Sequence, residues 1–134
     1  AGSGPDKDNA EKLIKEYGLT EQVILLGSLS NPYPYMKNAD LYIQPSRTEA
    51  APMTFGEANI LKTPVLTTNT LSASEFVKHN ETGYICENSE EGLASSFEYI
   101  VTHREVLCTY REGLKKNEWT NRVSLDKFNK IIED

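Results

Sequence analysis

The sequence alternates between short apolar runs and longer segments with helical spacing, and no other feature constrains the fold as strongly. Each run of four or five residues suits a buried strand, whereas the longer segments carry apolar residues three and four positions apart. Strands that alternate with helices form a parallel sheet, because each helix returns the chain to the edge where the previous strand began. The sequence therefore predicts an α/β fold, with a parallel sheet that has helices on both faces.

The predicted elements follow one another without a repeat or a low-complexity tract. Gly18 stands where the first helix should stop, and Pro64 stands at the first residue of a strand, where its missing N–H is tolerated. Ser72 and Ser74 are candidate caps for a short helix. We expect strands at residues 23–26, 40–44, 64–67 and 83–86, a helical turn after residue 31, and helices at residues 7–17, from 52 or 53 to 61, 72–77, from 89, 103–117 and 125–132.

Composition excludes several classes of function. A chain of 134 residues fits one domain, and a net charge of -6 argues against the basic surface that nucleic-acid binding needs. No apolar run approaches the roughly 18 residues of a transmembrane helix. Cys86 and Cys108 lack metal or redox spacing and are interpreted as reduced thiols in a cytosolic protein, and His79 and His103 have no ligand partners at suitable spacing. We therefore expect no metal, no cofactor, no nucleic-acid partner and no transmembrane segment.

The candidate site lies in residues 44–58, which leave a strand, cross a loop of small residues and enter a helix. Parallel sheets bind ligands in the crevice at the carboxyl ends of their strands, so this loop is well placed. With Pro52 at the first helical position, the next amides should lack partners within the helix, namely those of Met53, Thr54 and Phe55. Together with the helix dipole, these amides would form an anion site suited to a diphosphate.

Two carboxylates, Glu49 and Glu57, flank this anion site. Because carboxylates repel phosphate, we interpret them as acceptors for sugar hydroxyls on either side of a diphosphate, each bond contributing roughly 1.5–3 kcal/mol. The small side chains of Ala50 and Ala51 would let a ligand approach the backbone between them. Each glutamate also has a simpler interpretation, Glu57 as an acid that stabilises a helix start and Glu49 as an exposed loop acid.

Glu49 and Glu57, with seven residues between them, resemble the E-x7-E motif of GT4-type retaining glycosyltransferases, the group 1 glycosyl transferases. Further segments are similar to that family in the same order: its GxGP turn, its V-x-x-L-G strand, its A-D-L and P-S strand, and its P-V strand. No single segment is specific, but the whole set in this order is. The matching segments are residues 2–5, 23–27, 39–46 and 64–68, followed by Glu75 and Gly83, so the resemblance covers about residues 1–100.

The resemblance implies the C-terminal half of a GT-B fold, a Rossmann-like parallel sheet with helices on both faces. Residues 1–134 would then be a nucleotide-sugar-binding domain that lacks its upstream strands and the N-terminal acceptor domain. In that fold, two strands lie between the strand at residues 23–26 and the strand at residues 40–44. The glycine-rich start at residues 1–5 has no strand before it, so we expect the chain to begin inside a domain, with an expression scar as the alternative.

The resemblance also implies the roles of individual residues. Glu49 would contact the donor hexose at the catalytic centre, Glu57 would bind the ribose hydroxyls, and Leu29 would pack near the nucleobase. Gly4 belongs to the GxGP turn on the donor side. The family usually needs no tightly bound metal, and its Arg/Lys pair lies upstream of the GxGP turn, where this chain has no matching residues. The residues expected to present amides to the sugar and the diphosphate are Ala50, Ala51, Pro52, Met53 and Thr54.

These features predict the donor-binding half of a retaining glycosyltransferase that transfers a hexose from a nucleoside-diphosphate sugar to a glycan or lipid-linked acceptor. The acceptor would bind through the missing domain, so the chain alone should be inactive. We expect a cytoplasmic enzyme of polysaccharide synthesis, peripheral at the inner membrane through the missing domain. Two alternatives stay open: another GT-B enzyme such as a sugar-nucleotide epimerase or a phosphorylase, and a Rossmann-like module that binds nucleotides or partners without chemistry.

Overall fold

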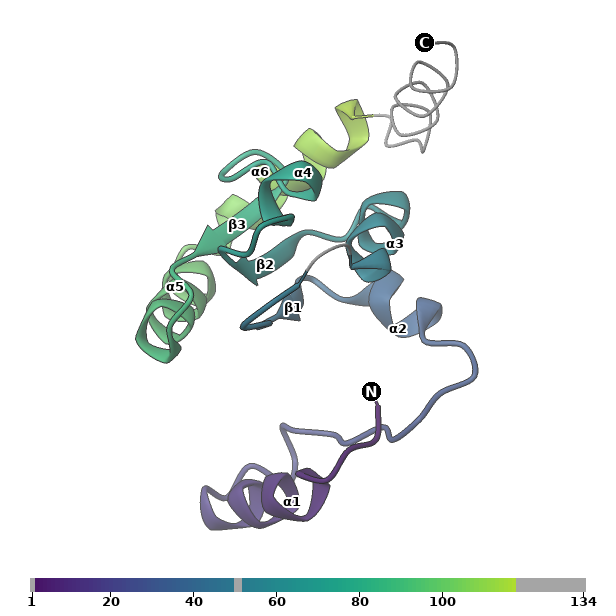
Figure 1. Ribbon diagram of the computed structural model, residues 1–134, viewed down its shortest axis with the longest axis vertical. Coiled ribbons are helices and arrows are strands. Elements are labelled where there is room, and N and C mark those ends of the chain that lie inside the picture. The colour runs from purple at the N-terminus through teal and green to yellow at the C-terminus, as the bar shows by residue number, and fades with distance from the viewer. Residues whose placement is uncertain (1, 50–51, 118–134) are drawn as a thin grey trace, which may run out of the picture. The chain divides into compact units, whose positions relative to one another are not determined.

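The computed structural model describes residues 2–49 and 52–117, and the chain divides into two compact units between Pro34 and Tyr35. Each unit is described by itself. Helix α1 (Lys7–Glu16) belongs to the first unit. The other elements, labelled in Figure 1, are α2 (Tyr33–Asn38), β1 (Tyr42–Gln44), α3 (Met53–Leu61), β2 (Val65–Thr68), α4 (Ala73–Phe76), β3 (Gly83–Cys86), α5 (Glu90–Thr102) and α6 (Glu105–Lys116).

The second unit is built on a parallel sheet in the order β1-β2-β3, as Figure 1 shows. Strand β2 lies in the middle and is buried along its whole length, as expected of a strand whose sheet is covered on both faces. Leu66 pairs with Ile43 on one side and with Tyr84 on the other. The predicted parallel sheet is therefore confirmed, with β1 two residues shorter at its start than expected and β2 shifted by one residue.

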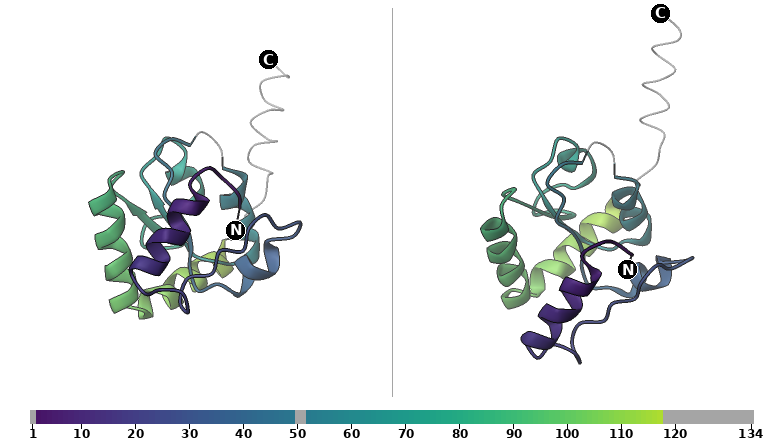
Figure 2. Two further views of the ribbon diagram at one scale, coloured as in Figure 1. Left: turned by 90° about the horizontal axis from the view of Figure 1, so that it is seen from below. Right: turned by 60° about the horizontal axis from the view of Figure 1, so that its bottom comes forward.

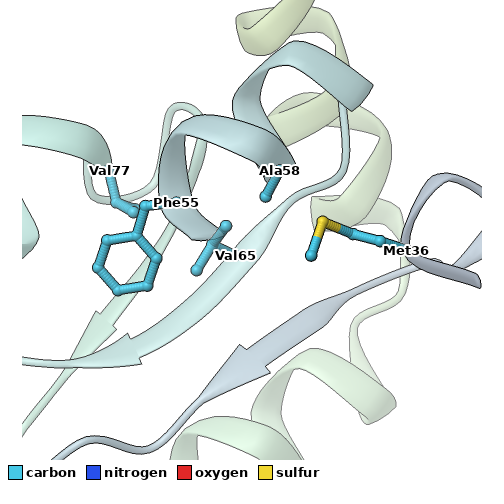
Figure 3. Packing of buried hydrophobic residues seen from close by; sticks show 5 residues of the cluster. All are labelled: Met36, Phe55, Ala58, Val65 and Val77. Atoms are coloured by element: carbon cyan, nitrogen blue, oxygen red, sulfur yellow. The ribbon is translucent and has the colours of Figure 1, made fainter. Parts of the chain in front are cut away.

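Both faces of this sheet are covered, because neighbouring residues of a strand point to opposite sides. Val65 packs with Phe55 and Val77 on the face covered by α3, as Figure 3 shows. Leu66 packs on the other face with Ile100 of α5 and with Tyr110 of α6. The two views of Figure 2 show α5 and α6 in this unit from further directions. The prediction of helices on both faces is confirmed.

Helices α3 and α6 are tied together at their carboxyl ends by Lys62. Its backbone is left-handed, with φ 60°, and closes α3. Its Nζ donates hydrogen bonds to the carbonyl oxygens of Leu114, at 2.9 Å, and of Asn117, at 3.2 Å. A cation at the last carbonyls of a helix also interacts favourably with the helix dipole. This link helps to hold α3, and with it the start of that helix, on the sheet.

In the first unit, the glycine-rich turn lies against the loop that follows residue 26. The Gly2 amide donates to the Gly27 carbonyl at 2.6 Å, and the Ser28 hydroxyl donates to the Ser3 hydroxyl at 3.1 Å. Gly18 ends the predicted helix, as expected, in a left-handed conformation with φ 65°. The two segments that resemble the GxGP turn and the end of the V-x-x-L-G strand are therefore neighbours within this unit.

The predicted strand at residues 23–26 is wrong. These residues are described without strand structure, and the Ile24 side chain is 74% exposed. A strand needs a neighbouring strand to pair its backbone N–H and C=O groups, and an apolar run cannot supply those partners by itself. The two strands expected between residues 23–26 and residues 40–44 stay a prediction, and the helix expected at residues 125–132 lies outside the described residues.

Candidate functional site

The candidate site begins where β1 ends, in the loop at residues 45–49. Carbonyl oxygens along this stretch accept hydrogen bonds from side chains of segments that lie far away in the sequence. The Thr67 hydroxyl donates to the Gln44 carbonyl at 3.0 Å, and the Thr68 hydroxyl donates to the Ser46 carbonyl. The Asn88 side-chain amide donates to the Arg47 carbonyl at 2.8 Å, and the Ser72 hydroxyl donates to the Glu49 carbonyl at 3.3 Å. The protein's own side chains therefore hold the loop backbone at three points and the last residue of β1 at a fourth.

The two threonines explain why the loop takes this path. Thr67 and Thr68 end β2, next to the end of β1, and both are buried. Buried hydroxyls and buried loop carbonyls each need a hydrogen-bond partner, and here they satisfy one another. From the sequence, Thr67 is expected at the end of a strand and residues 64–68 resemble a family segment, but neither observation predicts these bonds to the loop. A polar pair that closes an otherwise apolar strand, beside the loop of interest, was the available signal.

Glu49 is anchored through one of its two carboxylate oxygens. The Oε2 atom accepts hydrogen bonds from the Gln44 Nε2, at 3.2 Å, and from the Ser46 Oγ, at 3.4 Å. Within residues 2–49 and 52–117, the Oε1 atom has no hydrogen bond. The side chain is half-buried, unlike that of an exposed loop acid. This carboxylate can therefore accept a hydrogen bond from a ligand hydroxyl through Oε1 without giving up its own anchors.

The start of α3 offers fewer amides than expected. Pro52 is the N-cap residue, with φ -71° and ψ 113°, so the helix proper begins at Met53. The Phe55 amide already donates to the Pro52 carbonyl at 3.2 Å, which corrects the prediction that it has no partner within the helix. The N–H groups of Met53 and Thr54 remain the helix-start donors that cannot be paired inside the helix. They are the amides that an anion could use here.

Glu57 lies in the second turn of α3 and is half-buried. The first turn of α3 contains no acidic residue. A helix dipole acts mainly within the first turn, so dipole stabilisation explains Glu57 less well than the sequence alone indicated. Residues three and four apart share one side of a helix, which places Glu57 on the same side as Met53 and Thr54.

A hollow of about 470 Å³ opens beside Glu49 at the carboxyl ends of the strands. The Thr70 hydroxyl oxygen near it is buried and has no hydrogen-bond partner in the part of the chain that the structure describes. Neither Thr54 nor Glu57 lines this hollow. The residues around it are Arg47, Thr48, Glu49, Asn69, Thr70, Leu71, Ser74 and Asn88.

The other predicted site residues are distributed as follows. Gly4 and Leu29 belong to the first unit. Gly4 and residues 24–27 line a hollow of about 360 Å³ in this unit. Leu29 is half-buried. Ala50 and Ala51 lie outside the described residues. Over the described ranges, no group of three or more His, Cys, Asp or Glu side chains could hold a metal ion, and no helix could span a membrane.

Comparison with known proteins identifies the family. The model of the family "Glycosyl transferases group 1" matches residues 1–118. An uncharacterized glycosyltransferase of Haemophilus influenzae is 25% identical over 136 residues, which cover 99% of this chain and 37% of that protein. The capsular polysaccharide biosynthesis glycosyltransferase CapM of Staphylococcus aureus is 30% identical over 105 residues, which cover 75% of this chain and 28% of CapM.

Solved structures confirm the fold. S. aureus TarM, in a crystal structure with UDP and other ligands, matches with a TM-score of 0.79 at 23% identity, over 98% of this chain and 28% of TarM. Anabaena HepE in complex with UDP matches with a TM-score of 0.70 at 21% identity, over 86% of this chain and 34% of HepE. The chain thus spans only about a third of these proteins. By its match over residues 1–118, the chain belongs to the group 1 glycosyl transferases.

Proposed function

We propose that this chain is the donor-binding part of a longer retaining glycosyltransferase. In this proposal residues 1–134 form the C-terminal nucleotide-sugar-binding domain, and a domain outside the chain binds a glycan or lipid-linked acceptor. The observation that carries the proposal is the Glu49 carboxylate, which is anchored through Oε2 at the carboxyl end of β1 and whose Oε1 has no hydrogen bond within the described ranges. A sheet of this kind places its ligands at that edge.

The diphosphate of the donor would lie at the start of α3. The N–H groups of Met53 and Thr54 and the positive end of the helix dipole attract an anion there. Glu57, on the same side of the helix, would accept hydrogen bonds from the ribose hydroxyls. UDP is named in the crystal structures of both TarM and HepE, which share this fold, and this supports a nucleoside diphosphate as the ligand.

Glu49 would hold a hydroxyl of the donor hexose through Oε1. Transfer breaks the bond between the anomeric carbon and the diphosphate oxygen and forms a bond from that carbon to the oxygen of an acceptor hydroxyl, with retention of configuration. The proton of that hydroxyl passes to the departing diphosphate. Negative charge then develops on the departing diphosphate, and fixed N–H groups at a helix start stabilise such charge.

CapM is named for capsular polysaccharide biosynthesis, which supports a glycan product. The free cysteines Cys86 and Cys108 support the cytoplasmic location expected from the sequence.

A calorimetric titration of the full-length protein with UDP, GDP and ADP tests this proposal. We expect one of the three to bind, and we expect Glu57→Ala to weaken that binding roughly tenfold or more, because a hydrogen bond to a charged group is lost. Glu98→Ala is the matched control, since it removes the same charge from an exposed position within α5. Failure of all three nucleotides to bind, or equal affinities for the Glu57→Ala and Glu98→Ala variants, would refute the site.

A further inference from the structure

The Gln44 side chain lies in the middle of a chain of hydrogen bonds that joins the start of α3 to Glu49. Its Oε1 atom accepts hydrogen bonds from the Thr54 Oγ1, at 2.6 Å, and from the Tyr42 hydroxyl, at 2.8 Å. Its Nε2 atom donates to the Glu49 Oε2 at 3.2 Å. All three bonds are part-buried, so water competes with them less than it would at the surface. Gln44 therefore connects the proposed diphosphate site with the proposed sugar site.

The donors and acceptors in this series of hydrogen bonds can be assigned in only one way. An ionised carboxylate only accepts hydrogen bonds, so the atom of Gln44 that meets Glu49 has to be the Nε2 donor. The carbonyl oxygen of Gln44 then points the other way and accepts the protons of two hydroxyl groups, those of Tyr42 and Thr54. A flipped amide would place two acceptor oxygens against each other at Glu49. The contacts therefore favour one orientation of Gln44 and, through it, one position of the Glu49 Oε2.

The backbone beneath Gln44 is also held. Gln44 is the last residue of β1 and pairs with Thr67 in the sheet, and its carbonyl accepts the Thr67 hydroxyl at 3.0 Å. Hydrogen bonds made from a strand position are more precise than those made from a loop. The side chain that anchors Glu49 thus extends from the sheet, whereas Glu49 itself lies in the following loop.

We propose that Gln44 is a positioning residue for recognition of the donor sugar. It holds the Glu49 Oε2 so that Oε1 stays available to a sugar hydroxyl, and it ties that carboxylate to Thr54, whose amide lies in the proposed diphosphate site. This inference rests on the proposed function above. It requires Gln44 to contribute to the affinity for a nucleotide sugar and to contribute little to the affinity for the nucleotide alone.

The test uses the full-length protein and compares the dissociation constants of UDP, UDP-glucose and UDP-N-acetylglucosamine, or of the GDP or ADP series if that nucleotide binds instead. Gln44→Met removes the amide with little change in size. Gln44→Glu keeps both acceptor bonds to the hydroxyls but replaces the Nε2 donor with an oxygen. For both variants, we expect a roughly tenfold loss of affinity for the best-binding nucleotide sugar and a change of less than about twofold for the nucleotide.

The pH profile of Gln44→Glu separates positioning from a merely structural role. Two carboxylates that share a site raise the pKa of one of them, so lowering the pH adds one proton to the pair and restores a donor between positions 44 and 49. The loss of nucleotide-sugar affinity should therefore shrink as the pH falls from about 8 to about 5. Gln22→Glu, the same substitution at an exposed position of the first unit, is the matched control and should show no such recovery.

The outcomes separate this inference from the proposed function. Absence of nucleotide binding by the natural protein would sink the proposed function. If the Gln44 variants bind the nucleotide and the nucleotide sugar with the same ratio of affinities as the natural protein, whether or not both are weakened, the role of Gln44 is overturned and the proposed function is not. If Gln44→Glu does not fold, Gln44→Met decides by a double-mutant cycle: in a Glu49→Ala background it should cause no further loss of nucleotide-sugar affinity, and an additive loss would contradict the proposal.

Discussion

Two threonines of this protein differ in whether their hydroxyl groups have hydrogen-bond partners. Thr67 and Thr70 lie three positions apart, yet the hydroxyl of Thr67 bonds to the Gln44 carbonyl, whereas the buried hydroxyl of Thr70 has no partner among the described residues. An unsatisfied buried hydroxyl costs about 1–3 kcal/mol, while a satisfied one contributes modestly to stability. The same residue type therefore has opposite effects on stability at these two positions.

This contrast gives a prediction for the free energy of unfolding. Thr67→Val should lower it by about 0.5–1.5 kcal/mol, because the hydrogen bond between the Thr67 hydroxyl and the Gln44 carbonyl is lost. Thr70→Val, a substitution of the same shape, should leave it unchanged or raise it, because no bond is lost. Urea unfolding of the two variants measures the difference. Equal destabilisation by both substitutions would contradict the hydrogen-bond assignment.

Tyr110 provides a prediction at alkaline pH. Its side chain is 2% exposed, and burial, together with the nearby Tyr99 and Tyr84, raises the pKa of its phenol from 10.0 to about 12. A raised pKa means that the folded protein favours the neutral phenol more than the unfolded chain does. This contribution to stability is complete below pH 10 and is lost as the pH rises to about 12.

Unfolding free energies measured across that interval test the Tyr110 assignment. Tyr110→Phe should show a shallower loss of stability between pH 10 and pH 12 than the natural protein. Tyr17→Phe is the matched control, because Tyr17 is 70% exposed and its substitution should leave the slope unchanged. A Tyr110→Phe slope equal to that of the natural protein would show that the phenol does not titrate differently on folding.

The sequence could name Glu49 and Glu57 but not the side chains that position them. The glutamates stand out because carboxylates flank a helix start that suits an anion. Ser72 and Asn88 are ordinary polar residues that only the folded chain brings to the loop, and Gln44 precedes the loop without any pattern that indicates its bond to Glu49. Their contacts join positions up to 41 residues apart, a separation over which sequence spacing carries no information.

At the level of elements, prediction succeeded where an element can satisfy its backbone locally or against a described neighbour. The strand at residues 83–86 was predicted with its observed bounds, since it pairs with β2. Helix α5 begins where the pattern changed, with the Ser89 hydroxyl accepting the Gly92 amide at 3.0 Å. Residues 23–26 have an equally apolar run, but the described residues of their own unit include no strand, and they form none. An apolar run therefore indicates a candidate strand, and the strand forms only where its backbone pairs with a neighbouring strand.

At the scale of the whole molecule, the chain covers only part of the length of its relatives. The chain spans 37% of the Haemophilus protein and 28% of CapM, so the acceptor side and the overall reaction are matters for the full-length protein. The family assignment and the α/β fold are shown for this chain, whereas the domain arrangement, the retaining mechanism and the hexose stay predictions.

A crystal structure of the full-length protein with its nucleoside diphosphate would show whether the start of α3 holds the donor. We expect phosphate oxygens within about 3.5 Å of the Met53 or Thr54 amide nitrogen and a ribose hydroxyl at a similar distance from the Glu57 carboxylate. A nucleotide bound elsewhere on the protein, with the start of α3 and Glu57 free of it, would contradict the account.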